Sequence, residues 1–452
     1  MIEKYLNNRF LILYIIPFIF GSLSILSFEP FNLTLVNFII FPFFFYLLVY
    51  INKKSKAVYR KKPYKKNLFI FGMAFGFGFY LIGISWITNS LTFDENFNVL
   101  IPFALILIPL FLSLFVGLVT LVIGPYLKLD FPSLILFSAS FAFSDYLRAI
   151  IFTGFPWNLW AYSTSSFNEL LQIINQIGLY SYNLFVISIF SFPIIFFFKI
   201  SKIQKLFCIT ITFLIVLSLF IYGNYKVNKN RNVIENANEK IYVKIISPNF
   251  DLKYGLNSKE IEERLKKLIR YSDPVKDKKT LFIWPEGVFS GYSYDQILIF
   301  KELIFENFSS NHLIIFGTNT LDPISGSFYN SLLVINNNFD IIQSYKKRKL
   351  VPFGEFLPFE SILNKFGLKK ITEGYGSFLR GESQNNLVLN GLNILPLICY
   401  EVIFTEFIQQ SNANTNLIIN ISEDAWFGNS IGPYQHFAKG IFRAIEKNSF
   451  LI

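Results

Sequence analysis

Long stretches of apolar, uncharged residues dominate the first half of this chain of 452 residues. A helix needs about 18 or more apolar residues to cross the hydrocarbon core of a bilayer. We expect seven transmembrane helices, at roughly 10–28, 32–51, 68–88, 99–124, 133–150, 168–198 and 206–222. The first stretch lacks a small-residue cleavage site and further spans follow it, which indicates an anchor and not a removed signal peptide.

The pattern changes after residue 240 to short β-branched or apolar runs separated by polar helical stretches. Residues 258–271, "SKEIEERLKKLIRY", have the spacing of an amphipathic helix. Because strands that alternate with helices are typical of an α/β sandwich, we predict a transmembrane domain at 1–225 and a water-soluble α/β domain at 226–452. The runs that predict strands are 241–247, 280–286, 312–318, 331–337, 393–400 and 416–422.

Composition agrees with a membrane protein, since 53% of the residues are hydrophobic and only 16% are charged. The net charge of +11 does not indicate nucleic-acid binding. Much of it lies in the loop at 51–66, which has eight basic residues and no acidic one, and the chain has no stripe of interleaved aromatic and basic residues. We therefore expect no nucleic-acid partner. The sequence does not define an oligomeric state, and a monomer is the default expectation.

The positions of Lys and Arg predict the orientation, because cytoplasmic loops retain positive charge. The basic loop at 51–66 should be cytoplasmic, and the loops at 125–132 and 199–205 fall on the same side. The loop at 89–98 has no Lys or Arg and falls on the other side. With an odd number of spans, everything after residue 222 lies outside. We predict a multi-pass protein of the inner (cytoplasmic) membrane whose α/β domain faces the periplasm.

Two features of the membrane half bear on function. Asp145 and Arg148 lie three residues apart on one helix face, and charged groups at membrane depth are usually paired. An internal ion pair is one interpretation; the other is that this pair and the loop at 153–160 shape a mouth under the outer domain. Trp157 and Trp160 in that loop fit either the mouth or aromatic anchors at the membrane interface.

Three segments of the outer half deliver reactive residues near strand ends, where open α/β sheets present their chemistry. Glu286 follows one strand and Cys399 ends another, while a cluster of lysines at 346–349 precedes a Pro-Phe-Gly turn. A thiol needs a base and a nearby positive charge before it can attack a carbonyl. A carboxylate can take the proton, and a lysine can stabilise both thiolate and oxyanion. Glu, Lys and Cys therefore form a sufficient catalytic set.

The sequence has few of the residues that other kinds of catalytic or cofactor site require. The chain has two histidines, and His312 lies inside a predicted strand, so a Cys–His arrangement stays open only through His436. We find no His or Cys cluster with metal-ligand spacing, no glycine-rich phosphate loop and no GxSxG elbow. We expect neither a metal nor another cofactor.

The outer half resembles the nitrilase-like domain of bacterial apolipoprotein N-acyltransferases, a branch of the carbon-nitrogen hydrolase superfamily. The upstream segments "FGFGFYLIGISWI" and "DYLRAIIFTGFPWNLWAYS" resemble the membrane half of that family, so the likeness covers nearly the whole chain. It implies that the α/β domain is an αββα sandwich. The motifs that carry it are "WPEG", "YKKRKLVPFGEFLPF", "GYGSFLRGE", "LICYEVIF" and "NISEDAWFGNSIGPYQHFAKGIFRAIE", in this order.

The resemblance assigns roles to the reactive residues. Glu286 matches the general base of the family and Cys399 its nucleophile. The family spacing Tyr-x-Lys-x-x-Leu-Val-Pro-Phe-Gly-Glu, counted from Tyr345, selects Lys347 as the catalytic lysine, which makes Lys346 and Lys349 solvated neighbours.

The resemblance also implies supporting residues. Glu355 corresponds to the second carboxylate, which holds the lysine, and Tyr400 and Glu401 adjoin the nucleophile. Trp426 matches an aromatic residue on a mobile loop over the site. Tyr254 stands where the family often has tryptophan, and we expect it to contact substrate.

The reaction implied is transfer of an acyl chain from a phospholipid, through a thioester on Cys399, to the α-amino group of the diacylglyceryl-cysteine of apolipoproteins. The implied donor is phosphatidylethanolamine, and the order of steps is ping-pong. Two alternatives remain: a membrane-tethered amidohydrolase with the same Glu, Lys and Cys, and a transporter or scaffold whose outer domain only binds.

The chain departs from the family pattern at two places. The usual "SND" before "AWFG" is "SED" here, with Glu423 in the middle. The family continues past the last residues, 448–452, with more strands and a final membrane helix. The resemblance therefore implies a C-terminally truncated chain, in which "NSFLI" begins a strand.

Overall fold

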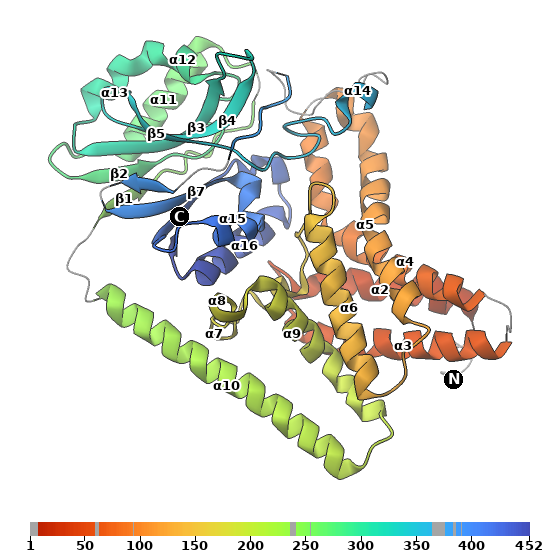
Figure 1. Cartoon of the computed structure of the whole chain (residues 1–452). Coiled ribbons are helices and arrows are strands. Elements are labelled where there is room, and N and C mark those ends of the chain that lie inside the picture. The colour runs from red at the N-terminus through yellow and green to blue at the C-terminus, as the bar shows by residue number, and fades with distance from the viewer. Residues whose placement is uncertain are drawn as a thin grey trace. The chain divides into compact units, whose positions relative to one another are not determined.

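Contacts between the described residues divide the chain into two compact units (Figure 1). Unit 1 comprises Met1–Val233 and Asn429–Glu446, and unit 2 comprises Ile234–Gly428 and Lys447–Ile452. The computed structural model describes residues 8–58, 63–93, 95–235, 241–253, 255–363, 376–382, 386–389 and 391–452.

Unit 1 is helical. Its helices are α2 (Ile16–Ser24), α3 (Asn37–Val58), α4 (Pro63–Gly83), α5 (Ile101–Ile123), α6 (Phe131–Ile150), α7 (Asn168–Leu171), α8 (Ile174–Ile177), α9 (Leu179–Ser191), α10 (Lys202–Glu235) and α16 (Gly432–Lys447). Among the described residues, six helical segments are long and apolar enough to cross a membrane: Thr34–Lys54, Lys65–Gly83, Glu95–Ile123, Phe131–Ile150, Leu179–Phe197 and Lys202–Glu235.

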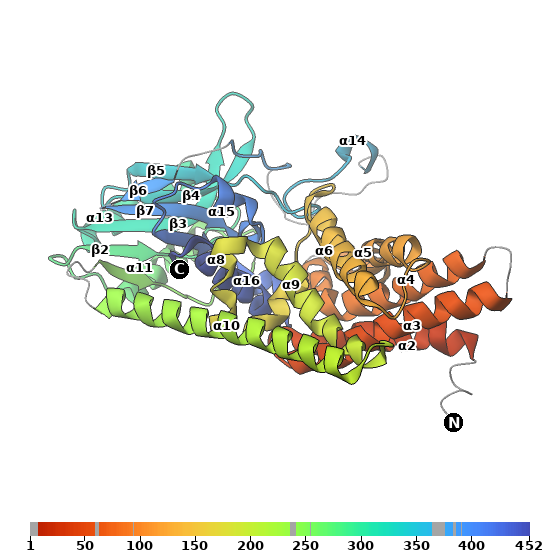
Figure 2. The ribbon, with the colours of Figure 1, turned by 60° about the horizontal axis from the view of Figure 1, so that its bottom comes forward.

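Three expected spans differ in length from the helices. The stretch expected at 10–28 forms a shorter apolar helix, Leu11–Ser27. The span expected at 168–198 begins only at Leu179, because Gly178 has a φ of +77° and ends α8 before it. The last span continues as α10 to Glu235, which makes one long uninterrupted helix (Figure 2).

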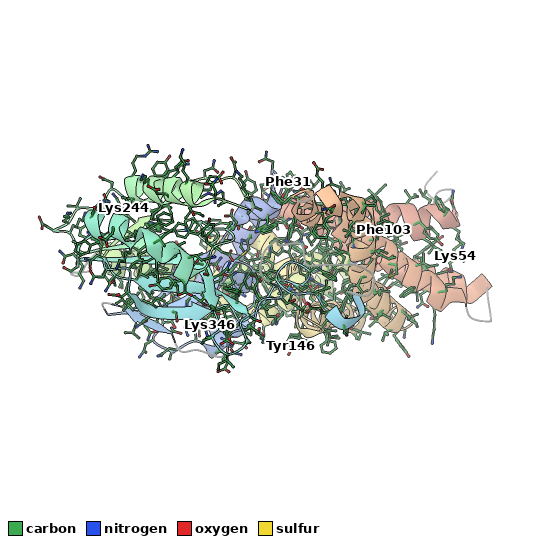
Figure 3. All side chains as sticks on the ribbon, turned by 90° about the horizontal axis from the view of Figure 1, so that it is seen from above. Phe31, Lys54, Phe103, Tyr146, Lys244 and Lys346 are labelled. Carbon is green, nitrogen blue, oxygen red and sulfur yellow. The ribbon has the colours of Figure 1, made fainter. Side chains whose placement is uncertain are left out.

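Apolar side chains cover much of the surface of unit 1, as Phe31 and Phe103 illustrate (Figure 3). Phe103 on α5 is 59% exposed, which suits contact with lipid chains. Inside the unit, α4 and α5 approach closely at glycines. A Cβ at Gly72 would lie 2.1 Å from Thr120 Oγ1, and one at Gly76 would lie 2.9 Å from the Cα of Ser113. Small residues at these positions allow the two backbones to pack together.

The ion pair between Asp145 and Arg148 is present, with 3.0 Å between Asp145 Oδ1 and a guanidinium nitrogen. Asn183 Nδ2 donates a hydrogen bond of 3.0 Å to the other oxygen of Asp145. Arg148 also donates to the backbone carbonyl oxygens of Phe155 and Asn158. The pair is therefore internal, as the first interpretation predicts, and Arg148 also holds the loop at 153–160 against α6.

Helix α16 belongs to unit 1 through contacts with this loop. Trp157 Nε1 donates a hydrogen bond of 2.7 Å to Gln435 Oε1, and its ring stacks on His436 with 5.8 Å between centroids. Lys439 Nζ lies 4.0 Å from the centroid of the Trp157 ring, a cation–π contact. Trp157 and Trp160 are both buried inside the unit, so the interpretation of these rings as interfacial anchors is wrong.

Unit 2 contains two sheets in its described part. The first has the order β1 (Tyr242–Ile245), β2 (Thr280–Ile283), β3 (His312–Leu321), β4 (Phe328–Ile335) and β5 (Ile341–Lys346). The second has the order β6 (Leu387–Leu389), β7 (Leu392–Ile398), β8 (Leu417–Ile421) and β9 (Phe450–Leu451). Strands β1 to β3 are parallel, as are β7 to β9, whereas β3 to β5 form an antiparallel meander and β6 pairs antiparallel with β7. The helices are α11 (Ser258–Ser272), α12 (Tyr294–Ile297), α13 (Lys301–Asn307), α14 (Glu360–Leu363) and α15 (Glu406–Gln410).

The expected strands and the amphipathic helix are confirmed. A capping box starts α11: Glu260 N–H donates to Asn257 Oδ1, and Asn257 N–H donates to a Glu260 carboxylate oxygen. Strands β5 and β6 were not predicted from the sequence, because β5 carries polar residues and is partly exposed and β6 has only three residues.

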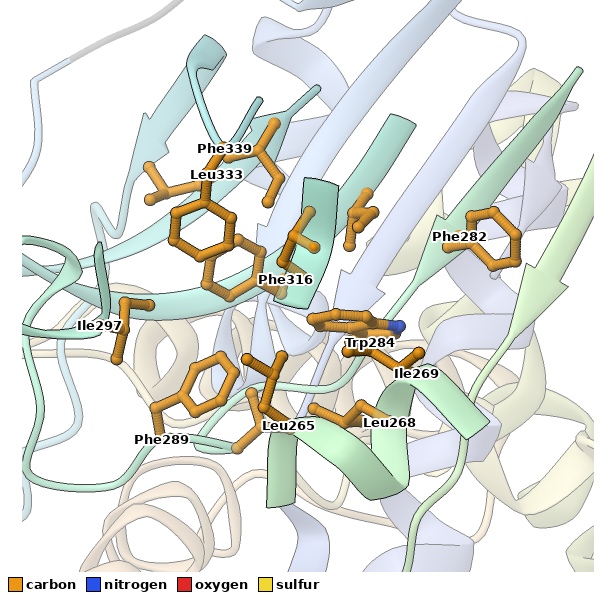
Figure 4. Close-up of a cluster of buried hydrophobic side chains, with 14 of the residues drawn as sticks. Leu265, Leu268, Ile269, Phe282, Trp284, Phe289, Ile297, Phe316, Leu333 and Phe339 are labelled. Atoms are coloured by element: carbon orange, nitrogen blue, oxygen red, sulfur yellow. The ribbon is translucent and has the colours of Figure 1, made fainter. Parts of the chain in front are cut away.

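Two apolar cores make the layers of unit 2. Between α11 and the first sheet, Trp284 and Phe316 pack with Leu265 and Leu268 (Figure 4). Trp284 is fully buried, and its Nε1 donates a hydrogen bond of 2.9 Å to Ser272 Oγ at the end of α11. The second core joins the two sheets face to face and includes residues of β2 to β5 and of β6 to β8. The predicted α/β sandwich is thus confirmed, with a helical layer, the first sheet and the second sheet in that order.

Candidate active site

Cys399 lies at the turn where β7 ends and a 3₁₀ helix, Cys399–Ile403, begins. Its φ of +51° is in the left-handed region, which residues other than glycine rarely adopt and which is often found at functional sites. The turn is closed by Ile398 N–H, which donates a hydrogen bond of 2.9 Å to Glu401 Oε2. The thiol is half-buried and packs against the core between the two sheets. This sharp strand-to-helix turn resembles the elbow that presents a nucleophile in other α/β enzymes.

Lys347 lies between two carboxylates. Its Nζ is 2.9 Å from Glu355 Oε1 and 3.6 Å from Glu286 Oε1, and its side chain is only 1% exposed. The other expected lysines point elsewhere: Lys346 lies over the ring of Tyr329 and Lys349 pairs with Glu406. Lys347 is thus the lysine of this cluster that meets Glu286 and Glu355.

The backbone on both sides of Lys347 is fixed. Lys347 N–H donates 2.8 Å to the carbonyl oxygen of Asn330 on β4, and its own carbonyl accepts at 2.8 Å from Gly381 N–H. A Cβ at Gly381 would lie 2.2 Å from the carbonyl oxygen of Lys346, so only glycine permits this approach. The "RGE" segment of the sequence motif therefore holds the lysine in place.

Asn330 is a residue of the site that the sequence did not indicate. Its Nδ2 donates hydrogen bonds of 2.8 Å to Glu286 Oε1 and of 2.8 Å to Glu355 Oε1. One amide group thus links the two carboxylates that flank Lys347. The sequence signal is a polar residue directly before the apolar run at 331–337, which is also common for residues of no functional importance.

Glu401 connects the two segments that carry Lys347 and Cys399. It is fully buried, and its Oε1 accepts from the N–H groups of Arg348 at 2.7 Å and Lys349 at 2.9 Å. Its Oε2 accepts from Ile398 N–H at 2.9 Å, and Tyr345 Oη donates to both oxygens at 3.0 Å. The carboxylate of Glu401 therefore ties the chain that follows β5 to the end of β7.

The charges of the cluster set its protonation states. Burial alone lowers the pKa of Lys347, but the carboxylates of Glu355 and Glu286 outweigh it and raise this pKa. Burial raises the pKa of the Cys399 thiol, and the charge of Glu286 raises it further against the opposing effect of Lys347. The resting site thus holds an ammonium group and a neutral thiol, so a base must remove the thiol proton as it reacts.

Ser422 and Asp424 also lie next to the thiol. Asp424 raises the pKa of Cys399, while a hydrogen bond between Ser422 and the Cys399 side chain lowers it. Ser422 Oγ donates a short hydrogen bond to Asp424 Oδ1. Both residues belong to the "SEDAWFG" segment that follows β8, although the sequence analysis singled out only Trp426 and Glu423 there.

The remaining expected residues have different surroundings. Tyr400 is buried, with its ring edge-to-face on Phe404 at 5.0 Å between centroids. Trp426 is half-buried in the 3₁₀ helix Asp424–Phe427. Tyr254 lies outside the described residues. Within the described part of the chain, no group of three or more His, Cys, Asp or Glu side chains is placed to hold a metal ion.

Two family models match the chain. The model described as "Apolipoprotein N-acyltransferase N-terminal domain" matches residues 20–192, and that described as "Carbon-nitrogen hydrolase" matches residues 254–452. The first falls on the apolar helices, and the second on the unit that holds the Glu, Lys and Cys cluster. An apolar helical region is therefore followed by a nitrilase-like α/β domain, as the sequence analysis predicted.

Curated relatives named apolipoprotein N-acyltransferase align with nearly the whole chain. The relative from Rhodopseudomonas palustris is 29% identical over 457 residues, 97% of this chain and 83% of its own length. That from Bradyrhizobium diazoefficiens is 30% identical over 444 residues, 94% of this chain and 80% of its own length. An amidase from Neterenkonia, a solved structure, is 16% identical and covers 47% of this chain and 74% of its own, with a TM-score of 0.27 that carries no weight for function.

With its apolar helices, the protein is a membrane protein. The likeness to the Bradyrhizobium relative extends over most of both chains, and the two family models match the helical and the α/β part of this protein, so the family assignment covers both halves of the chain. It belongs to the apolipoprotein N-acyltransferase family.

Proposed function

We propose that this protein transfers an acyl chain from a phospholipid to the α-amino group of the diacylglyceryl-cysteine of apolipoproteins. The observation that carries the proposal is the buried Lys347, placed between Glu286 and Glu355 and next to the Cys399 thiol, in a chain that also has membrane-spanning helices. A soluble amide substrate would require the cluster but not the helices. An acyl donor that stays in the bilayer requires both.

The first half-reaction forms an acyl-enzyme. Glu286 takes the proton of the Cys399 thiol, and the sulfur attacks the ester carbonyl carbon of the phospholipid. The ammonium group of Lys347 stabilises the oxyanion that develops on the carbonyl oxygen. The ester C–O bond then breaks, and Glu286 returns the proton to the leaving oxygen. The products are a lysophospholipid and a thioester on Cys399.

The second half-reaction uses the same residues in the same roles, with the amine as the attacking group and the Cys399 sulfur as the leaving group. Glu286 accepts a proton from the α-amino group of the apolipoprotein cysteine as its nitrogen attacks the thioester carbonyl. Lys347 again stabilises the oxyanion, the C–S bond breaks, and the proton returns to the Cys399 sulfur. An amide forms and the free thiol is restored, with no cofactor consumed.

The supporting residues keep the site in this state. Glu355 keeps Lys347 protonated and in position, and Glu401 keeps the lysine segment against the Cys399 turn. We assign contacts with substrate to Trp426 and Tyr254, and a supporting role next to the nucleophile to Tyr400. Trp426 belongs to the segment after β8 that also contains Ser422 and Asp424, next to the thiol.

The location and partners belong to the same proposal. The loop charges favour the inner membrane with unit 2 on the periplasmic side. Phosphatidylethanolamine is the acyl donor that we propose, diacylglyceryl apolipoproteins are the acceptors, and the working form is a monomer. The Glu, Lys and Cys set on its own also serves amide hydrolysis, so the alternative is a membrane-tethered amidohydrolase.

Intact-protein mass spectrometry tests the proposal. The full chain in detergent, mixed with phosphatidylethanolamine, should gain the mass of one acyl chain, and hydroxylamine should remove it because it cleaves thioesters. Cys399→Ala should gain nothing, whereas Cys208→Ser, which removes the other cysteine of the chain, should behave as the wild type. Acyl mass on Cys399→Ala, or ammonia release from amides without any acyl-enzyme, would contradict acyl transfer through Cys399.

A further inference from the structure

Ser422 lies beside Cys399 because the strands that precede the two residues are in register. Strands β7 and β8 run parallel, and Ile398 at the end of β7 is paired with Ile421 at the end of β8. The next residue after each strand is Cys399 or Ser422, so the thiol and the hydroxyl leave the sheet at the same edge. A hydrogen bond joins their side chains. The sheet therefore places a hydroxyl group against the proposed nucleophile.

The hydroxyl of Ser422 also has a second partner. Its Oγ donates a short hydrogen bond to Asp424 Oδ1, two residues further along the same segment. The segment is fixed from another side, because Glu423 N–H donates a hydrogen bond of 3.2 Å to Glu286 Oε2. Ser422 and Asp424 are both half-buried, so the contact between them is partly shielded from water.

One hydroxyl proton cannot serve both partners at once. A serine has a single O–H donor and two lone pairs. While Cys399 is a neutral thiol, the Asp424 carboxylate is the stronger acceptor of this proton, and a lone pair of Ser422 Oγ remains for the S–H group. When Glu286 takes the thiol proton, the sulfur becomes an anion and competes for the same O–H. A rotation about the Cβ–Oγ bond then moves the hydrogen bond from Asp424 to the sulfur.

We propose that Ser422 is a further catalytic residue, whose hydroxyl donates to Cys399 Sγ when the sulfur is negatively charged and to Asp424 when it is not. The inference rests on the proposed role of Cys399 as the nucleophile. The sulfur carries negative charge twice, before it attacks the ester and again as the C–S bond of the thioester breaks. Ser422 keeps its own proton throughout, and the thiol proton still moves to and from Glu286.

Asp424 affects the sulfur in two separable ways. Burial and the charge of Glu286 raise the pKa of Cys399 most, and the charge of Asp424 raises it further. The Asp424 carboxylate also competes with the sulfur for the hydroxyl proton of Ser422. A neutral amide at position 424 would remove the like charge and weaken the competitor. Only the second effect requires the hydroxyl of Ser422.

The first experiment compares Ser422→Thr with Ser422→Val, which have nearly the same shape and differ in the hydroxyl group. The rate of Cys399 alkylation by iodoacetamide is measured by intact mass on the full-length Cys208→Ser protein. Ser422→Thr should stay within about threefold of the parent protein, whereas Ser422→Val should slow about 10- to 100-fold, the range for one hydrogen bond to a charged group. Ser325→Val is the matched control, because Ser325 Oγ donates 2.6 Å to Asp322 Oδ2 in the exposed turn between β3 and β4.

A double-mutant cycle tests the switch between the two partners. Asp424→Asn should speed alkylation, and at least about threefold more with Ser422 present than in Ser422→Val, because only the hydroxyl makes Asp424 a competitor. Equal acceleration in the two backgrounds would mean that Asp424 acts through its charge alone and would overturn the proposal. Should Ser422→Val not fold, Ser422→Ala takes its place in the same cycle.

Equal alkylation rates in Ser422→Thr and Ser422→Val, with matching thermal unfolding midpoints, would likewise reject a role for the hydroxyl. With phosphatidylethanolamine, Ser422→Val should slow acylation at saturating lipid and the cleavage of the acyl-enzyme by hydroxylamine, while the lipid concentration at half-maximal rate stays the same. A change in that concentration alone would point to lipid binding and contradict the proposal. Alkylation needs no lipid, so a protein that alkylates as expected but forms no acyl-enzyme would reject the proposed function alone.

Discussion

The hydrogen bonds of Asn330 provide a sharp test of how Glu286 is positioned. Asn330→Leu removes the amide that donates 2.8 Å to Glu286 and 2.8 Å to Glu355 but retains a side chain of similar size. The backbone bond from Lys347 N–H to the Asn330 carbonyl does not depend on the side chain and should survive. The substitution therefore isolates the effect of the amide on the two carboxylates.

The expected effect follows from the strength of one bond to a charged group, about 1.5–3 kcal/mol. Without Asn330, the contacts of Glu286 with the other described residues are longer, at 3.2 Å from Glu423 N–H and 3.6 Å from Lys347 Nζ. At about 1.4 kcal/mol for each factor of ten in rate, acylation of Cys399 should slow by about 10- to 100-fold. The loss should appear in the first half-reaction, because the orientation of the base determines thiol deprotonation.

The assay is a single-turnover measurement of acyl-enzyme formation by intact mass, with the thermal unfolding midpoint measured on the same sample. Asn338→Leu, in the exposed turn between β4 and β5, is the matched control. If Asn330→Leu is folded and forms the acyl-enzyme within about threefold of the wild-type rate, then Asn330 does not hold the base and the assigned geometry of Glu286 is wrong.

Three further outcomes follow from the site. Gly381→Ala should slow acylation at least about tenfold, because its Cβ would lie 2.2 Å from the carbonyl oxygen of Lys346, whereas Gly376→Ala, with nothing within 4 Å, should not. Lys347→Met should form no acyl-enzyme and lose about 3–5 kcal/mol of stability, because it leaves buried carboxylates uncompensated; a wild-type unfolding midpoint would contradict this. Burial raises the pKa of Glu401 from 4.5 to about 7, so the folded state retains a proton that the unfolded chain has lost, and stability should fall as pH rises through this window. Between about pH 5 and about pH 8, the thermal unfolding midpoint should fall less with pH in Glu401→Gln than in the wild type. An equal fall in the two proteins would refute this role of Glu401.

The sequence predicts two segments of the candidate site because each one follows a run of apolar residues that predicts a strand, whereas the segment of Lys347 follows β5, which the pattern does not predict. Glu286 and Cys399 both occupy such positions, and Glu355 sits in a fixed motif next to Lys347. The contacts among these side chains could not be predicted from the sequence. They depend on the pairing of two sheets, which brings Glu401 into hydrogen-bonding range of residues more than 50 positions earlier.

Asn330 shows the same limit more clearly. A polar residue in a strand is ordinary until the neighbouring strands are placed, and only the β3 to β5 meander brings its amide beside Glu286 and Glu355. The expected span at 168–198 was too long because hydropathy does not report where the backbone breaks a helix. Gly178, with its positive φ, ends α8 within a stretch that hydropathy alone reads as continuous.

The placement of α16 limits how far the two halves of the protein can be exchanged. This helix comes after the segment with Trp426 in the chain, yet its Gln435 and Lys439 contact Trp157 in the membrane unit. A chimera that combines the membrane half of one relative with the nitrilase-like half of another must transfer α16 and the loop around Trp157 together. Separate inheritance would leave a buried lysine without its aromatic partner, so these two distant stretches should evolve as one unit.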